Sequence, residues 1–426
     1  MHVAIIGNGV AGVSAALRLR ERRPDWRITL VSGESSYHYS RPALMYVFMG
    51  HMRYQDTKPY EDSFWSEQRL DLVRAWVRAI DFEHKRLLLH EKPPLAWDKL
   101  LIATGSKPNR FGWPGQDLEG VQGLWGLADL KSLHDGASRT RSAVIVGGGL
   151  IGIELAEMLH SRGVHVTFLV REPSYWSLIL PLEESRMVNR VVLEQGIELR
   201  LQTQLKAILD DGAGRCAAVL TDKDERIECQ LVGLTAGVSP NLDLVRGTQL
   251  KTARGVLVDG SFRTNLPDVF AAGDCAEIVV EGGENLVQQV WYTGKKQGEV
   301  AGDVIAGEER RYEPGIWFNS AKFFDLEYQT YGQVQRKVPG EGNLYWEHAD
   351  GKRSIRVVHA AGRVIGFNLM GIRWRHEVCE RWISEGRSLD HVLARLAEAN
   401  FDPELYRRFE SDVARAFAAP RTSVHS

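Results

Sequence analysis

The chain has 426 residues, of which 44% are hydrophobic and 25% are charged, and its formal net charge at pH 7 is −2. This composition is typical of a soluble globular protein with roughly two or three domains, and the near-neutral charge predicts no nucleic-acid partner. No apolar stretch approaches the roughly 20 residues that span a bilayer, so we expect no membrane span. The four cysteines form no CxxC pair and no metal-like cluster, and an expected strand that begins at residue 2 leaves no room for a signal peptide. We therefore expect a cytoplasmic protein without a metal site.

A glycine-rich turn comes first along the chain. Residues 2–6 are apolar, the motif G-x-G-x-x-G occupies residues 7–12, and residues 13–19 have a helical pattern. Such glycines permit a tight turn, a close approach of the backbone to a diphosphate, and close packing of helix on strand. The helix N-terminus attracts the phosphate charge. A second expected strand, residues 26–31, leads to Glu34, about 20 residues beyond the motif, where an acid binds a ribose. We predict that this first dinucleotide site includes Gly7, Gly9, Val10, Ala11, Gly12 and Glu34.

The next segments return the chain to the same sheet. A polar, aromatic loop with an Arg41-Pro42 pair follows Glu34. Residues 70–81 and 85–90 alternate as strands around a tight turn, which predicts a small antiparallel excursion. Residues 100–108 then form a buried strand that ends in a turn.

The organisation repeats from residue 143. An apolar strand, residues 143–146, leads into glycines at residues 147–152, a helical segment, and a strand over residues 165–170 that ends at Arg171 and Glu172. Two motifs in the same strand–turn–helix–strand context predict two dinucleotides that lie end to end. The second site is predicted to include Gly147, Gly149, Leu150, Ile151, Gly152, Glu154, Arg171 and Glu172.

Further elements follow in the same α/β style. We expect a helix over residues 182–195, short strands over residues 197–200, 216–220 and 231–234, a strand over residues 268–272, and a helix over residues 293–305. Asp274 stands just past the last of these strands. It is equally well a hydrogen-bond acceptor for a polyol hydroxyl or a helix N-cap.

The character of the sequence changes after about residue 314. An aromatic-rich segment, residues 316–332, precedes strands that share an alternating pattern and then amphipathic helices. The strands are expected over residues 344–347, 354–359 and 364–369, and the helices over residues 377–385, 389–399 and 403–417.

This C-terminal region has several arginines beside tryptophans. They form either a solvated helix face over a small core or a docking patch for an acidic carrier or a second subunit. The residues are Arg373, Arg375, Arg381 and Arg387 beside Trp374 and Trp382.

Taken together, the motifs resemble those of the FAD-dependent pyridine nucleotide oxidoreductases, over residues 1 to about 310. Four motifs occur in the family's order: residues 7–12 with Glu34, Ala103-Thr104-Gly105, residues 147–152 with Glu154, and Ala272-Gly273-Asp274. The resemblance implies an α/β fold with two Rossmann-like dinucleotide-binding domains and a C-terminal α+β domain with a helical tail. It also implies FAD in the first domain and NADH or NADPH in the second.

The implied domain boundaries split the FAD-binding domain. It would comprise residues 1–114 and 255–312, the NAD(P)H-binding domain residues 115–254, and the C-terminal domain, an acceptor or dimer interface, residues 313–426.

The family also implies roles for individual residues. Asp274 would hold the ribityl chain, and Glu154 would lie where the nicotinamide meets the flavin. Arg41 and Pro42 would lie beside the flavin, and these two with Glu154 are the predicted catalytic residues. Further cofactor contacts are predicted at Val77, Ala103, Thr104, Gly105, Gly237, Trp291 and Tyr292.

The branch of the family follows from residues 35–51, which contain no cysteine. Disulfide reductases of the family carry one or two cysteines there. Residues 39–44 instead resemble the Arg-Pro-x-Leu segment of ferredoxin and rubredoxin reductases and of apoptosis-inducing-factor-like proteins. Those relatives usually continue with Ser-Lys, whose lysine pairs with the glutamate equivalent to Glu154, whereas this chain has Met45 and Tyr46. Residues 318–332 resemble the opening of the C-terminal domain in the ferredoxin-reductase relatives.

The resemblance implies transfer of a hydride from NAD(P)H to FAD and of electrons to a small carrier protein such as ferredoxin or rubredoxin. The alternatives are an NADH oxidase that reduces oxygen or a peroxide, and a redox-responsive interaction protein that binds FAD and NADH. For the oligomeric state, a homodimer is an alternative to a single chain.

The choice of nucleotide depends on the end of the strand over residues 165–170, where an acid selects NADH and an arginine NADPH. Val170 takes the usual acidic slot, Arg171 and Glu172 argue in opposite directions, and Gly152 in place of alanine favours NADH.

Overall fold

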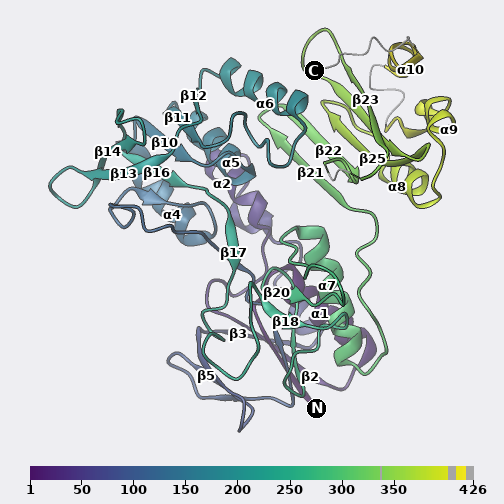
Figure 1. Ribbon diagram of the computed structural model, residues 1–426. Coiled ribbons are helices and arrows are strands. Elements are labelled where there is room, and N and C mark those ends of the chain that lie inside the picture. Colours follow the sequence, from purple (N-terminus) through teal and green to yellow (C-terminus); the bar gives the residue numbers. More distant parts are fainter. Residues whose placement is uncertain (336–337, 402–408, 419–426) are drawn as a thin grey trace. The chain divides into compact units, whose positions relative to one another are not determined.

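The computed structural model describes residues 1–335, 338–401 and 409–418 (Figure 1). The chain forms two compact units: unit 1 comprises Met1–Thr140 and Gly233–Glu313, and unit 2 comprises Arg141–Val232 and Pro314–Ser426. Within the described ranges, no helix is both long enough and apolar enough to cross a bilayer. The domain boundaries inferred from the sequence stay a prediction.

Unit 1 is built on a parallel five-stranded sheet in the order β19-β7-β1-β2-β3. Its strands are β19 (Val269–Ala271), β7 (Lys99–Ile102), β1 (His2–Ile6), β2 (Arg27–Ser32) and β3 (Leu70–Arg74). The inner residues of β1, β2, β7 and β19 are almost all apolar and buried, as expected for a parallel sheet covered on its faces, whereas the edge strand β3 is more exposed. Helices α1 (Val10–Arg22) and α7 (Trp291–Ile305) pack closely on each other, which a Cβ at Gly298 would prevent because it would lie 2.2 Å from the Ala11 carbonyl oxygen.

Shorter elements complete unit 1. The helical turns are η1 (Arg41–Ala43), α2 (Leu44–Met49), η2 (Tyr54–Thr57), α3 (Phe64–Glu67), α4 (Leu127–Gly136) and η3 (Ala137–Arg139). The strands are β4 (Val77–Asp81), β5 (Arg86–Leu89), β6 (Leu95–Ala96), β8 (Ser106–Pro108), β9 (Val121–Gln122), β17 (Val238–Pro240), β18 (Val256–Val258) and β20 (Ala276–Ile278).

Residues 70–81, predicted as one strand, form two. β3 extends the parallel sheet beside β2, and β4 pairs antiparallel with β5, which confirms the excursion but moves its start to Val77. The chain changes partner at Ala75, whose N–H donates to the Ser32 carbonyl oxygen at 3.0 Å. Residues 100–108 likewise divide into β7 and β8.

A second sheet of the same kind has as neighbours, in this order, β12 (Glu198–Leu201), β11 (His165–Val170), β10 (Ser142–Val146) and β16 (Leu231–Leu234). Of these four strands, all residues except the last two of β16 belong to unit 2. Helix α5 (Leu150–His160) follows β10, and α6 (Leu182–Glu194) follows β11. A small antiparallel sheet lies between β12 and β16 in the sequence. Its strands are β13 (Leu205–Asp210), β14 (Cys216–Thr221) and β15 (Arg226–Glu228).

The C-terminal part of unit 2 is an antiparallel sheet in the order β21-β22-β25-β24-β23, followed by helices. The strands are β21 (Phe318–Phe323), β22 (Leu326–Gly332), β23 (Glu341–Glu347), β24 (Ser354–Ala360) and β25 (Arg363–Met370). The helices are α8 (His376–Ser384), α9 (Leu389–Leu393), η4 (Leu396–Ala399) and α10 (Glu410–Ala418). The predicted fold class, α/β with two Rossmann-like sheets and a C-terminal α+β region, is confirmed. Of the helix predicted over residues 403–417, residues 403–408 lie outside the described ranges.

The tryptophans of the C-terminal region belong to its core, since Trp374 and Trp382 are 3% and 1% exposed. The neighbouring arginines form surface ion pairs, such as Arg381 with Glu398 and Arg387 with Glu385. These contacts agree with the interpretation as a solvated helix face over a small core.

Candidate functional site

The first glycine motif has the geometry that a diphosphate requires. Gly7 has a φ of +111°, and a Cβ there would lie 2.1 Å from the Ala103 carbonyl oxygen. A Cβ on Gly12 would lie 2.1 Å from the Gly7 carbonyl oxygen, so α1 packs directly on the turn. A Cβ on Gly9 would meet no atom within 4 Å. The backbone is therefore open at Gly9, where α1 begins and its unpaired N–H groups attract an anion.

Side chains from the loop after β2 fix the second residue of this motif. The Asn8 amide donates to the Ser35 carbonyl and hydroxyl oxygens, both at 3.1 Å. The His38 ring nitrogen Nδ1 lies 2.8 Å from the Asn8 carbonyl oxygen. Burial lowers the pKa of His38, so the imidazole is neutral at pH 7 and donates this hydrogen bond. The loop that follows the ribose-binding position is thereby attached to the glycine turn.

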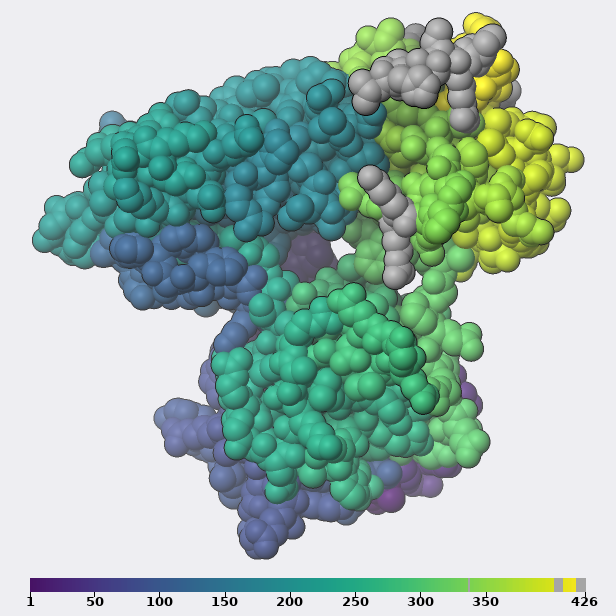
Figure 2. Space-filling model, viewed as in Figure 1, coloured from purple at the N-terminus to yellow at the C-terminus, as the bar shows by residue number. Residues whose placement is uncertain are grey.

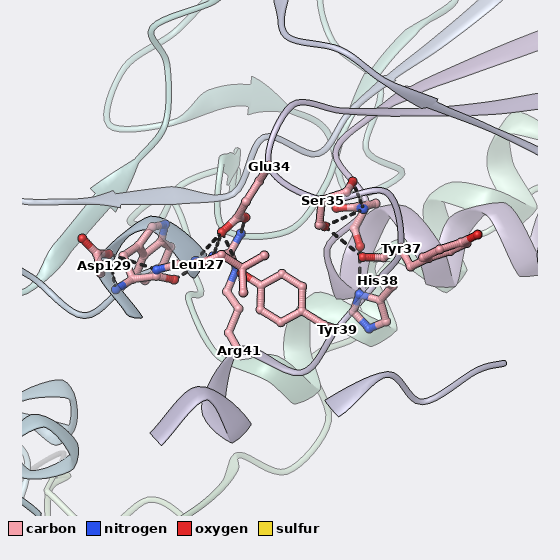
Figure 3. Close-up of polar contacts among 11 residues, drawn as sticks. Glu34, Ser35, Tyr37, His38, Tyr39, Arg41, Leu127 and Asp129 are labelled. Carbon is pink, nitrogen blue, oxygen red and sulfur yellow. Dashed lines mark hydrogen bonds and ion pairs between the residues drawn. The ribbon is translucent and has the colours of Figure 1, made fainter. Parts of the chain in front are cut away.

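Glu34 lies at the centre of a polar cluster (Figure 3). Its carboxylate accepts hydrogen bonds from the Tyr39 hydroxyl at 2.7 Å and the Leu127 N–H at 3.0 Å, and it forms an ion pair with Arg41. Although burial opposes it, the Arg41 charge with these hydrogen bonds holds the pKa of Glu34 below its usual value. Oxygen Oε2 accepts only from Arg41 among the described residues, so it has a lone pair left for a ribose hydroxyl.

The Arg41 guanidinium also donates to the Trp125 carbonyl oxygen at 2.6 Å. Its charge acts on Asp274 as well as on Glu34, because it favours ionisation of both carboxyl groups. Arg41 is therefore close enough to both predicted binding acids for its charge to act on each of them. Pro42 is exposed at the start of η1. The location of both residues beside a flavin ring stays a prediction.

Asp274 follows β19 and faces β8. The Ser106 hydroxyl donates to its carboxylate at 2.6 Å, and burial raises the pKa of Asp274. The preceding residue, Gly273, donates its N–H to the buried Gln297 amide oxygen of α7 at 2.9 Å. Both the polar side chain and the turn that carries it are thus held by specific partners.

The remaining predicted contacts of unit 1 lie on connecting segments. The Thr104 hydroxyl donates to the Asn241 carbonyl oxygen at 2.9 Å, between the turn after β7 and the segment after β17. Ala103 and Gly105 flank it, Val77 begins β4, and Gly237 precedes β17. Trp291 and Tyr292 begin α7, and they are 46% and 42% exposed.

The second glycine motif repeats the geometry of the first inside unit 2. Gly147 has a φ of +119°, α5 begins at Leu150, and a Cβ on Gly149 would again meet no atom within 4 Å. The buried Tyr175 hydroxyl donates to the Gly149 carbonyl oxygen at 2.8 Å. The motif is thus held by the loop that connects β11 with α6.

Glu154 and Glu157 lie one turn apart on α5. Lys322 of β21 forms an ion pair with Glu157 at 2.8 Å. No described side chain donates a hydrogen bond to Glu154, and burial together with the Glu157 charge raises the pKa of Glu154 to about 7. A Glu154 carboxyl that is partly protonated at neutral pH can both donate and accept a hydrogen bond.

The end of β11 contains the residues expected to select the nucleotide. Val170 is fully buried, so its side chain cannot contact a ribose. Arg171 and Glu172 form an ion pair at 2.8 Å, and the Glu172 side chain is the less exposed of the two, at 17% against 67%.

The comparisons with known proteins agree with these two motifs. The pyridine nucleotide-disulphide oxidoreductase family model matches residues 1–298. The chain belongs to this family. It is an FAD-dependent NAD(P)H oxidoreductase, and both glycine turns leave the open backbone that the two nucleotides require.

Curated relatives and solved structures share most of the chain's length. The ferredoxin–NAD(+) reductase component of a biphenyl dioxygenase system from Paraburkholderia xenovorans is 30% identical over 307 residues, which cover 72% of this chain and 75% of that protein. A rubredoxin–NAD(+) reductase from Pseudomonas putida is 29% identical, over 65% of this chain and 72% of its own. The fold is that of a ferredoxin reductase from Rhodopseudomonas palustris, at a TM-score of 0.80 and 23% identity, with 97% of this chain and 99% of that chain covered.

Several residues that hold the site were not expected from the sequence. Tyr39, Gln297 and Tyr175 all act by bonding to a predicted site residue or its backbone. For Tyr39 a signal existed, because it precedes Arg41 in the segment that resembles the reductases. Gln297 and Tyr175 belong to segments with no local sign of their partners.

Proposed function

We propose that this enzyme takes electrons from NADH and delivers them, through FAD held by unit 1, to a small electron-carrier protein of the ferredoxin or rubredoxin kind. The observation that carries the proposal is the combination of two open glycine turns with a flavin-side loop that has no thiol. The names of the two curated relatives given above, a ferredoxin reductase and a rubredoxin reductase, support the same acceptor class.

Unit 1 supplies the residues that would hold FAD. The N-terminus of α1 and the open backbone at Gly9 would bind the diphosphate. Arg41, which forms an ion pair with Glu34, would lie beside the flavin. Glu34 would accept a ribose hydroxyl, and Asp274, oriented by Ser106, would accept a ribityl hydroxyl. When bound, FAD supplies the hydride-accepting ring and returns electrons singly or in pairs. The chain's own part is to bind, orient and shield it.

Unit 2 supplies the residues that would hold the nicotinamide nucleotide. The N-terminus of α5 would bind its diphosphate, and Glu172 would accept its ribose hydroxyls. NADH is the proposed nucleotide, because the Glu172 carboxylate would repel the 2′-phosphate of NADPH while Arg171 is already paired with that carboxylate. Glu154 would hold a proton at its carboxyl oxygen. It could then either donate a hydrogen bond to the carboxamide of the nicotinamide or accept one from it.

Electrons would leave from the flavin edge rather than from a protein thiol. η1 and α2, which follow the ribose-binding acid, contain no cysteine. Cys275 follows Asp274 but is fully buried, and its thiol donates to the carbonyl oxygens of Ile102 and Ala272, each at 3.4 Å. The exposed rings of Trp291 and Tyr292, at the start of α7, offer a contact surface for a carrier instead.

Anaerobic mixing of the FAD-loaded protein with NADH or NADPH tests the donor side. We expect bleaching of the flavin absorbance at least tenfold faster with NADH. A preparation that contains no flavin, or one that NADPH reduces faster, contradicts the corresponding part of the proposal.

The acceptor side is tested with the same reduced protein. Ferredoxin and rubredoxin should reoxidise it much faster than oxygen or hydrogen peroxide does. If oxygen or peroxide is the fastest acceptor, the protein is an oxidase. Slow turnover with all four, with a long-lived reduced flavin–NAD complex, indicates a redox-responsive interaction protein.

A further inference from the structure

Two cysteines of unit 2, distant from both glycine motifs in the sequence, lie in contact with each other. Cys216 begins β14, and Cys229 follows the last residue of β15, the antiparallel neighbour of β14. Their sulfur atoms are 3.7 Å apart, and the Cys216 thiol is 3.6 Å from the Cys229 carbonyl oxygen. The ladder continues to Cys229, whose N–H donates to the Ala217 carbonyl oxygen at 3.0 Å. The backbone therefore fixes both residues side by side.

The separation of the two sulfur atoms is close to that needed for a bond. A disulfide has an S–S distance of about 2.0 Å, so the atoms have to approach each other by about 1.7 Å. Rotations about the two Cα–Cβ bonds can supply much of a movement of this size. The strands are already paired, so no rearrangement of the sheet is required.

Access for a small oxidant comes from the neighbouring hairpin. Cys216 is 5% exposed and Cys229 is fully buried. Residues 211–215, immediately before Cys216, are all exposed and form the turn between β13 and β14. β15 pairs with β14 through only three residue pairs, and short ladders at the edge of a sheet open locally at low cost. Cys216 is thus the more accessible of the two sulfur atoms.

The two thiols also differ in acidity. The contact between the two sulfur atoms lowers the pKa of Cys216, while the same contact and burial raise the pKa of Cys229. Because the thiolate is the nucleophilic form of cysteine, Cys216 is the first to react with an electrophile. Cys275 and Cys379 differ from it, since burial raises the pKa of each thiol and neither has a sulfur neighbour among the described residues.

We propose that Cys216 and Cys229 form a peroxide-sensitive dithiol that closes to an intramolecular disulfide. The Cys216 sulfur attacks one peroxide oxygen, the O–O bond breaks, and a sulfenic acid and one water result. The Cys229 thiol then attacks that sulfur, the S–S bond forms, and the S–O bond breaks to release a second water. Two thiols lose two electrons, and one hydrogen peroxide becomes two waters. A thiol reductant reverses the closure by exchange.

The disulfide would tie β14 to the segment that enters β16. Gln230, next to Cys229, donates its N–H to the Ser142 carbonyl oxygen, and its side-chain oxygen accepts from the N–H groups of Arg141 and Ser142. Closure would therefore restrain the small sheet at the start of β10, which leads to the second glycine motif. This inference does not depend on the proposed electron acceptor.

The test counts free thiols in the full-length, FAD-loaded protein. The protein is treated with hydrogen peroxide, denatured and alkylated with N-ethylmaleimide, and its intact mass is measured. The untreated chain should take up four labels, one for each cysteine. The oxidised chain should take up two, and peptide mapping should find Cys216 joined to Cys229. Dithiothreitol should restore all four labels.

Matched variants distinguish this pair from general oxidation. Cys216→Ser should keep three labels after peroxide treatment, whereas Cys379→Ala should fall from three labels to one. Cys229→Ala should form no intramolecular disulfide, and its Cys216, which has no second thiol to attack it, should lose its label and gain oxygen. Four labels on the treated wild-type chain, oxygen adducts in place of a disulfide on that chain, or a disulfide-linked dimer would overturn the proposal. So would loss of labels in a Cys216→Ser protein that circular dichroism shows to be folded. If this test fails, the proposed function is unaffected, because the test counts cysteine labels and does not measure electron transfer through FAD.

Discussion

At the scale of single residues, Glu154 provides the clearest link between environment and pH. Burial and the Glu157 charge raise the pKa of Glu154 to about 7, from an ordinary value of 4.5. The folded protein therefore binds more protons than the unfolded chain between about pH 4.5 and pH 7. Ionisation of Glu154 thus costs stability, a cost that is absent below the unfolded pKa and complete above the folded pKa.

We predict that Glu154→Gln removes this cost. The variant should gain roughly 1–2 kcal/mol in free energy of unfolding over the wild type at pH 8, and little at pH 4.5. Urea unfolding at the two pH values measures the difference. A gain that is the same at both pH values would mean that packing, and not ionisation, separates the two proteins. The matched control is Glu172→Gln, which makes the same substitution at a carboxylate that forms an ion pair with Arg171.

The backbone geometry of the glycine turns was predictable from the sequence. The spacing of Gly7, Gly9 and Gly12 alone predicts a tight turn, a close approach of the backbone to the diphosphate, and close packing of helix on strand. The contacts that a Cβ would make at each position agree with these expectations. The partners of Glu34 were not predictable in the same way. Tyr39 and Arg41 are close in sequence, but Leu127 lies 93 residues away and reaches Glu34 only through the fold.

At the scale of elements, α6 and β24 are joined by a buried ion pair. Glu184 of α6 is fully buried, Arg356 of β24 is 5% exposed, and the guanidinium donates to both carboxylate oxygens, at 2.7 and 2.8 Å. The Asn368 amide of β25 donates to the same carboxylate at 3.1 Å. Figure 2 shows the teal atoms of the α6 region in contact with the green atoms of this sheet.

Arg356→Met should lower the free energy of unfolding by roughly 3–5 kcal/mol, because it leaves the Glu184 charge buried without its partner. Chemical unfolding of the purified protein measures the loss. The double variant Glu184→Gln/Arg356→Met should recover a large part of it. Lys352→Met is the control, since it breaks an exposed ion pair with Glu194, and it should cost less than about 1 kcal/mol. If Arg356→Met and Lys352→Met lower the free energy of unfolding equally, burial does not determine the strength of the ion pair.

Elements were predictable where an apolar period continued without interruption. The helix expected over residues 182–195 is α6, and the strands expected in the C-terminal region are β23, β24 and β25 with small shifts at their ends. Errors arose where alternation persisted through a change of partner. Residues 70–81 alternate throughout, but the pairing changes at Ala75, and residues 389–399 divide into α9 and η4. The hydrophobic period of the sequence does not show which distant strands pair or where a short helix ends.

At the scale of the whole molecule, the two predicted nucleotide sites belong to different compact units. Residues 7–12, Glu34 and Asp274 lie in unit 1, and residues 147–152 with Glu172 lie in unit 2. The split of the first unit by the second was implied by the resemblance. The packing of the C-terminal sheet against α6 was not, because Glu184 and Arg356 look like ordinary surface charges in the sequence. Only the tertiary structure brings their charges together.

This division predicts that each ligand protects its own unit. ADP-ribose, which lacks the nicotinamide, should slow amide hydrogen exchange of the FAD-loaded protein around residues 147–154 and 170–172. Removal of FAD should speed exchange around residues 7–12 and 272–275. A ligand that binds only the folded state stabilises that state by about 2.7 kcal/mol at a concentration 100 times the Kd, and an effect of this size is measurable by mass spectrometry of peptides. If ADP-ribose slows exchange equally in both units, the two units respond as one body and the assignment of one nucleotide to each is wrong. Since residues 99–102 of β7 lie in unit 1 and outside both motifs, they provide the internal reference for the ADP-ribose measurement.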